Sequence, residues 1–257
     1  MENIYVASML AKYKEIAASV LGRVKTVALL YGGISDEREV SIASGMSVLE
    51  ALEDEGFIVI PIDTGEKEFI NELIEARPDL AFIALHGKGG EDGCIQGFLE
   101  TLGIPYTQSG VESSALAMDK RVSKILYENC GLATPAFLEI QQNKKPDEAD
   151  LDKIIEKIGL PCVVKPAHGG SSLEVSIPKT RKELQEILSR DFTTMGALLI
   201  EEFIRGIEVT VPVIGNKPEE LFAFPAIEII PKNEFYDYES KYTDGGSEHI
   251  IPARISK

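Results

Sequence analysis

The stretch VVKPAHGGSSLEVS, from Val163 to Ser176, combines residue types that a surface loop rarely needs together. Lys165 ends an apolar run of strand character, so its ammonium group can reach an anion from a fixed base. Two glycines and two serines follow, and their backbone N–H groups and hydroxyls are donors that suit phosphoryl oxygens. The pattern predicts a flexible lid over a phosphate group, formed by Gly169, Gly170, Ser171 and Ser172.

Two carboxylates follow in LLIEEFIRGIEVT. Glu201 and Glu208 occupy strand-like positions on either side of a turn at Gly206. Either carboxylate could accept a hydrogen bond from an adenine amino group or a ribose hydroxyl. By itself this segment fits equally a hairpin flanked by surface carboxylates, so both interpretations stay open.

Two glycine-containing loops come earlier in the chain. HGKGGEDG places His86 beside four glycines, whose backbone N–H groups could approach an anion, and both a structural and a catalytic histidine fit that setting. YGGISDEREVS lacks the dinucleotide-binding glycine pattern and predicts a turn before a helix capped by Ser35 or Asp36. Glu37 suits the positive end of that helix.

Strands and helices alternate from Lys25 onward, and they predict the scaffold for these loops. The strands are apolar on both faces, which predicts a parallel, Rossmann-like sheet of roughly 90 residues. Ligands bind such sheets at the carboxyl ends of the strands, where Gly32–Gly33 and His86–Gly93 fall. The helix expected after the first strand carries four apolar residues on one face, Ile42, Met46, Leu49 and Leu52.

The pattern changes after residue 110. We predict one helix over Ser114–Cys130, then amphipathic helices between turn-separated strands rich in β-branched residues. Such strands are typical of antiparallel sheets, so this half is predicted to be a second, α+β unit. The expected strands are PCVVKPA, LEVSIP, ALLIEEFI, EVTVPVIG and ELFAFPAIEII.

Composition limits the function classes. The 257 residues carry 26 Lys plus Arg and 42 Asp plus Glu, a formal charge of −16, which argues against nucleic-acid or anionic-membrane binding.

Three dispersed cysteines form no CxxC pair and indicate free thiols in a reducing compartment. Residues 1–23 do not fit the pattern of a signal peptide and are expected to form an amphipathic helix, packed on its own domain or on a partner. We expect a soluble, cytoplasmic protein.

Five stretches, in the family's order, resemble the D-alanine–D-alanine ligases of the ATP-grasp superfamily: LLYGGISDEREVSIASG, FIALHGKGGEDGCIQGFLETLGIPYTQSGVESSALAMDK, LPCVVKPAHGGSS, LIEEFIRGIEVTV and FYDYESKY. The resemblance implies α/β and α+β architecture, with a Rossmann-like (pre-ATP-grasp) domain followed by an ATP-grasp fold whose C-terminal subdomain is truncated. The implied divisions are a helical extension (1–23), the Rossmann-like substrate domain (24–113), the central ATP-grasp subdomain (114–201) and an incomplete C-terminal subdomain (202–257).

The resemblance also implies the chemistry. ATP phosphorylates the carboxylate of one D-alanine, and the amine of a second D-alanine attacks the acyl phosphate, giving D-alanyl-D-alanine for peptidoglycan precursors. The implied cofactors are ATP and Mg²⁺ (or Mn²⁺), and the implied assembly is a homodimer. The implied ATP contacts are Lys120 and Lys165 at the phosphates and adenine region, Glu201 and the backbone near Phe203 and Ile204 at adenine, Glu208 at the ribose, Lys241 at the transferred phosphoryl group and Ser172 in the lid.

Four further residues belong to the implied D-alanine site. Glu37 would bind the first D-alanine's ammonium group and join Ser171 and Tyr242 in a hydrogen-bonded triad that closes the lid. His86 would lie near that substrate's carboxylate. A tyrosine at position 242 goes in this family with dipeptide formation, whereas phenylalanine goes with D-alanyl-D-lactate ligases.

The sequence departs from the family's pattern in two places. Glu174 stands where the lid usually has a glycine, which would weaken ATP binding if its carboxylate faces phosphate. The chain ends before the family's magnesium carboxylates, so the expected metal ligands lie beyond Lys257. Two alternatives follow: a truncated or degenerate ATP-grasp protein that binds nucleotide without turnover, and an ATP-grasp ligase of another substrate.

Overall fold

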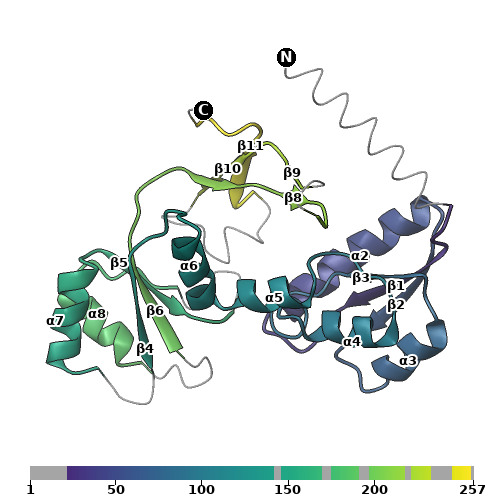
Figure 1. The fold of residues 1–257 in the computed structure, drawn as a ribbon, viewed down its shortest axis with the longest axis horizontal. Coiled ribbons are helices and arrows are strands. Elements are labelled where there is room, and N and C mark those ends of the chain that lie inside the picture. Colours follow the sequence, from purple (N-terminus) through teal and green to yellow (C-terminus); the bar gives the residue numbers. More distant parts are fainter. Residues whose placement is uncertain are drawn as a thin grey trace. The chain divides into compact units, whose positions relative to one another are not determined.

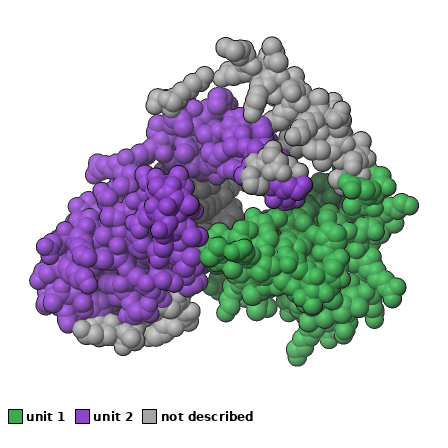
Figure 2. Space-filling view, in the orientation of Figure 1, with its two compact units in different colours: residues 1–118 green, residues 119–257 purple. Residues whose placement is uncertain are grey.

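The computed structural model describes residues 22–141, 146–169, 175–190, 197–217, 221–232 and 245–255. The chain divides into two compact units, Met1–Met118 and Asp119–Lys257, which Figure 2 shows in different colours. The helix predicted within residues 1–23 falls almost entirely outside the described residues, and no helix of the described chain is long and apolar enough to cross a membrane.

Unit 1 is built on a parallel sheet with strand order β2-β1-β3, which confirms the predicted Rossmann-like arrangement (Figure 1). Successive residues of β1 point to opposite faces of the sheet. Ala28 and Leu30 pack with residues of α3 and α4 in one apolar cluster. The elements are β1 (Thr26–Tyr31), α2 (Arg38–Asp54), β2 (Ile58–Asp63), α3 (Phe69–Ala76), β3 (Leu80–Ile83), α4 (Cys94–Leu102) and α5 (Val111–Met118).

Helix α2 approaches the sheet through small residues. Ser41 and Gly45 are its buried positions, and a Cβ added to Gly45 would lie 2.7 Å from the Cβ of Tyr31. Because the backbones come this close, larger side chains cannot occupy the contact. Met46, which the pattern places on the apolar face of this helix, is 43% exposed. The other three predicted positions are half-buried: Ile42, Leu49 and Leu52.

The helix predicted over Ser114–Cys130 is two helices, α5 and α6 (Lys120–Asn129), separated at Asp119. Asp119 has an extended backbone, with φ −88° and ψ 100°, and its side chain accepts hydrogen bonds from the backbone N–H groups of Arg121 and Val122. An N-cap aspartate starts a new helix at this point. Its cap geometry explains why the pattern does not continue as one helix.

A second sheet opens unit 2, with antiparallel order β4-β6-β5. Helices α7 and α8 pack against it, and together they form a core that includes Leu151, Ile154, Val164 and Ile200 (Figure 1). The predicted antiparallel α+β organisation is therefore confirmed. The elements are β4 (Phe137–Gln141), α7 (Glu148–Lys157), β5 (Cys162–Pro166), α8 (Arg181–Leu188) and β6 (Ala197–Glu202).

A third sheet, of order β11-β10-β7, and a two-stranded pair, β8-β9, complete the described fold. Two strands predicted as continuous are interrupted near Pro212 and Pro225, which have no backbone N–H to donate to a ladder. Of the predicted strand LEVSIP, the structure describes only a bridge between Ser176 and Val164. The strands are β7 (Glu208–Thr210), β8 (Val213–Ile214), β9 (Phe222–Ala223), β10 (Ile227–Pro231) and β11 (Ser247–Ile250).

Candidate functional site

In unit 1, the loop after β1 places Glu37 beside the loop after β3. Neither Ser35 nor Asp36 caps α2 as predicted, because Glu37 occupies the N-cap position without a side-chain capping bond. The Ser35 hydroxyl donates to the backbone carbonyl of His86 at 2.7 Å and accepts from the Glu37 N–H at 3.2 Å. Glu37 is 5% exposed, and its Oε2 would lie 2.7 Å from a Cβ added to Gly87. The structure therefore brings Glu37 and the His86 loop together.

The His86 loop satisfies much of its own hydrogen bonding. Nε2 of His86 lies 3.1 Å from the hydroxyl of Ser44 on α2. The N–H of Gly87 donates to Glu91 at 2.7 Å, and the N–H of Gly89 donates to Asp92 at 2.8 Å. These two donors were expected to be open to an anion, but the loop's own carboxylates occupy them.

An ion pair that the sequence did not indicate fixes the loop before Glu37. Arg38 binds Asp63 through two hydrogen bonds of 2.8 and 2.6 Å, and it also donates to the carbonyl of Gly33 at 2.8 Å. Asp63 accepts from the N–H groups of Gly33 at 3.2 Å and Gly65 at 2.8 Å. The Arg38 hydrogen bond lowers the pKa of Asp63 to about 2. Because Asp63 ends β2, this pair ties the Gly32–Gly33 turn to the neighbouring strand.

In unit 2, Lys165 and Glu201 come from neighbouring strands and form a part-buried ion pair. Lys165 on β5 donates to Oε2 of Glu201 on β6 at 2.9 Å. Glu201 is 7% exposed, and its other oxygen, Oε1, lies 3.4 Å from Nζ of Lys124. One carboxylate is therefore shared between two ammonium groups.

Lys124 on α6 was missed by the sequence analysis. Its side chain is buried; the ammonium donates to the Thr134 hydroxyl at 2.8 Å and lies 5.1 Å from the centre of the Phe137 ring. Burial lowers the pKa of Lys124, and the attraction of Glu201 opposes this shift. The only signal in the sequence is its position four residues after Lys120, which places both lysines on one side of a helix.

Lys120 lies at the carboxyl end of β5. Its backbone N–H donates to the carbonyl of Ala167 at 3.0 Å, and its ammonium donates to the carbonyl of Gly169 at 2.5 Å. Ala167 and Gly169 follow directly on the strand that carries Lys165. The start of α6 is therefore fixed to the segment that leads into the predicted lid.

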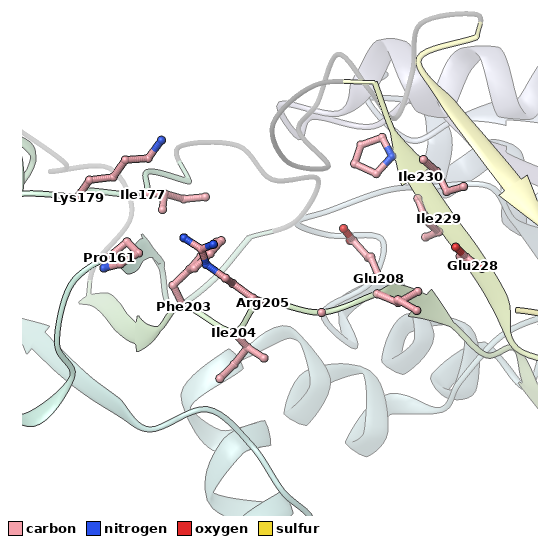
Figure 3. A pocket seen from close by; sticks show the side chains of 13 residues that line it. Pro161, Ile177, Lys179, Phe203, Ile204, Arg205, Glu208, Glu228, Ile229 and Ile230 are labelled. Carbon is pink, nitrogen blue, oxygen red and sulfur yellow. The ribbon is translucent and has the colours of Figure 1, made fainter. Parts of the chain in front are cut away.

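A cleft of about 810 Å³ in unit 2 is lined on one side by the segment that follows β6 and on the other by strands β7 and β10 (Figure 3). Phe203, Ile204 and Glu208, three predicted nucleotide contacts, line it. Lys165 and Glu201 are not among the lining residues, but Glu201 precedes Phe203 by two positions at the end of β6. The full lining is Pro161, Ile177, Lys179, Phe203, Ile204, Arg205, Gly206, Ile207, Glu208, Glu228, Ile229, Ile230 and Pro231.

Charged groups lie on both sides of this cleft. In Figure 3, Lys179 and Arg205 lie with Pro161 and Phe203 on one side, while Glu208 and Glu228 lie on the strands of the other side. Glu228 is 4% exposed and accepts from the Arg254 guanidinium at 2.6 and 2.9 Å and from its backbone N–H at 3.0 Å. These bonds lower the pKa of Glu228 to about 2 and fix its carboxylate.

Several predicted residues lie outside the described residues: Ser171, Ser172, Glu174, Lys241 and Tyr242. No group of three or more His, Cys, Asp or Glu side chains within the described ranges could hold a metal ion. The predicted free thiols are confirmed, with Cys94 and Cys130 exposed and Cys162 buried.

Two family models match the chain. The model described as D-ala D-ala ligase C-terminus matches residues 126–257, and that described as D-ala D-ala ligase N-terminus matches residues 67–109. A D-alanine–D-alanine ligase of Citrifermentans bemidjiense is 46% identical over 231 residues, which cover 90% of this chain and 71% of that protein.

Solved structures agree with the sequence comparison. The crystal structure of a D-alanine–D-alanine ligase from Bacillus anthracis matches with a TM-score of 0.72 and 36% identity, covering 90% of this chain and 73% of the other. A structure of the ligase from the same organism complexed with ATP matches with a TM-score of 0.71 and 32% identity, covering 90% and 72%. The predicted fold class is confirmed by these similarities.

Proposed function

The chain belongs to the D-alanine–D-alanine ligase family, and on this basis we propose that it serves the ATP-dependent ligation of two D-alanine molecules. ATP would phosphorylate the carboxylate of the first D-alanine, because a carboxylate oxygen is a poor leaving group. The amine of the second D-alanine would then displace phosphate and form the amide bond of D-alanyl-D-alanine. A role in peptidoglycan precursor synthesis, a cytoplasmic location and a homodimer remain predictions.

One observation carries the nucleotide part of this proposal. Phe203, Ile204 and Glu208, which the family resemblance assigned to adenine and ribose, line a single cleft of about 810 Å³. An aromatic ring and an aliphatic side chain suit the faces of a purine, and a carboxylate suits the hydroxyls of a ribose. The Bacillus anthracis ligase that the chain resembles has been solved with ATP, which supports the choice of nucleotide.

The lysines of unit 2 suit the charged end of the nucleotide. We assign Lys165 on β5, and Lys120, whose ammonium contacts the segment that follows β5, to the phosphates and adenine region, with Glu201 toward adenine. Lys241, Ser171 and Ser172 are assigned to the transferred phosphoryl group and the lid from the resemblance alone. Mg²⁺ or Mn²⁺ stays a prediction, and no described residue is assigned to it.

The first D-alanine is assigned to unit 1. The buried Glu37 carboxylate is proposed to bind its ammonium group, and His86, held by Ser44, to lie near its carboxylate. Ser171 and Tyr242 complete this assignment from the resemblance. A carboxylate and an imidazole in neighbouring loops are complementary to the two charged ends of a zwitterionic amino acid.

Phosphate release tests the proposed reaction. Purified protein given Mg-ATP is expected to release phosphate only when D-alanine is added, and mass spectrometry is expected to detect D-alanyl-D-alanine. D-serine, D-lactate and L-alanine serve as matched alternative substrates. Binding of ATP without any D-alanine-dependent phosphate release would contradict the proposed reaction, and stronger turnover with another substrate would replace D-alanine in it.

A further inference from the structure

The Glu201 carboxylate has two cationic partners with different surroundings. Lys165 contacts Oε2 at 2.9 Å and Lys124 approaches Oε1 at 3.4 Å. The three groups together carry a net charge of +1 when all are ionised. Such an excess of positive charge favours an anionic ligand over a neutral one of the same shape.

The two lysines differ in how far they could move toward a ligand. The side chain of Lys165 is 22% exposed, whereas that of Lys124 is 6% exposed. Lys124 is also held by the Thr134 hydroxyl and lies over the Phe137 ring. Of the two ammonium groups, only that of Lys165 is therefore placed to reach a bound molecule.

A buried carboxylate is costly without a partner. If Lys165 turned toward a phosphate and Glu201 had no other cation, the Glu201 charge would be left uncompensated in a site that excludes most water. Lys124 prevents this, because its contact with Oε1 does not depend on Lys165. With this geometry, Lys124 can compensate the Glu201 carboxylate while Lys165 reaches a phosphate. A single lysine could not do both at once.

We propose that Lys124 is a positioning residue, which keeps the Glu201 carboxylate compensated and in place and so frees the charge of Lys165 for the phosphates of a nucleotide. The inference rests on the proposed nucleotide site and adds a residue to it. Lys124 itself does not touch the nucleotide. Loss of Lys124 should therefore weaken the binding of a charged ligand more than that of a neutral one. Loss of a purely structural residue would weaken both equally.

Replacement of Lys124 tests this through the ratio of two affinities. Lys124→Met lowers the charge of the group from +1 to 0, so the affinity for ATP is expected to fall about tenfold relative to that for adenosine. Isothermal titration with ATP, ADP and adenosine measures the ratio. Lys124→Arg should restore it, and Lys153→Met, at an exposed lysine of α7, should leave it unchanged.

A double variant distinguishes charge from damage. Lys124→Met with Glu201→Gln has no buried carboxylate to leave unpaired, and Lys165 alone again gives a charge of +1. The ratio of ATP to adenosine affinity is expected to return to that of the wild type, even though the loss of Glu201 weakens both ligands. Equal losses for ATP and adenosine in Lys124→Met, or no recovery in the double variant, would overturn the proposal.

A second readout works without nucleotide. In Lys124→Met, Glu201 is left to pair with Lys165 alone, so acetic anhydride should label the Lys165 amine several-fold more slowly than in the wild type. If the wild type binds neither ATP nor adenosine, the proposed function fails, and this labelling still tests the sharing of Glu201. Unchanged labelling of Lys165 would refute that sharing.

Discussion

Arg38 and Asp63 bind each other through two hydrogen bonds of 2.8 and 2.6 Å, joining the start of α2 to the end of β2. Arg38 directly follows Glu37, which is assigned to the first substrate. A two-bond contact between planar groups fixes orientation as well as distance. Its loss should therefore disturb both the stability of unit 1 and the position of Glu37.

Asp63→Asn is the corresponding test. The pKa of Asp63 is lowered from 3.8 to about 2, so its stabilising effect is present above about pH 4 and is lost as the pH falls toward 2. After allowance for solvent screening, the variant should lose about 1 kcal/mol of unfolding free energy near neutral pH. Urea unfolding at about pH 7 and about pH 3 measures this. The same difference at both values would rule out the ion pair as its cause.

Gly45→Ala should destabilise unit 1. The new Cβ would lie 2.7 Å from that of Tyr31, so helix or strand must shift, at a cost of about 1–3 kcal/mol. Gly97→Ala, also inside a helix, is the control, because its Cβ meets only Val111 at 3.8 Å. That control should stay within about 1 kcal/mol of the wild type. Thermal unfolding compares them, and equal shifts would count against the close helix–sheet contact.

Arg254→Ala should loosen the β10–β11 ladder. The change leaves Glu228 buried without the guanidinium that lowers its pKa from 4.5 to about 2. Amide exchange along Ile227–Pro231 should become roughly tenfold faster near neutral pH. The difference should shrink as the pH falls from about 4.5 toward 2, because protonated Glu228 no longer needs the cation. Exchange that stays equal to that of the wild type at every pH would contradict this account.

Glu208→Gln should weaken nucleotide binding. Glu208 lines the cleft, whereas the exposed Glu202 at the end of β6 does not and provides a matched control. Removing one charged acceptor for a ribose hydroxyl should lower ATP affinity about tenfold, while Glu202→Gln stays within about twofold. Titration calorimetry distinguishes the two variants. A similar loss in both would point to general charge and not to a ribose contact.

The sheet of unit 1 could be predicted because its strands are apolar on both faces, a pattern that only a two-sided core explains. The break at Asp119 could not, because an aspartate inside a polar helical pattern also fits a solvated helix face. The proline interruptions near residues 212 and 225 were readable in principle, since proline cannot donate to a ladder.

The residues of the candidate site also differ in how well the sequence predicts them. The place of Lys165 at the end of a strand could be predicted, because an apolar run precedes it and a proline and glycines follow it. The burial of Lys124 could not, since a lysine in a charged helix normally faces solvent. This lysine is buried because α6 contacts β6, where its partner Glu201 lies 77 positions later in the sequence.

The loop after β3 supplies its own hydrogen-bond acceptors, since the backbone N–H groups of Gly87 and Gly89 donate to the side chains of Glu91 and Asp92. A loop with internal partners keeps its shape when nothing is bound, so ordering it is a cost of folding and not of ligand capture. A small zwitterion that binds at His86 would therefore meet a loop that is already ordered. Affinity there would then be set by the fit of its two ends and hardly at all by loop closure.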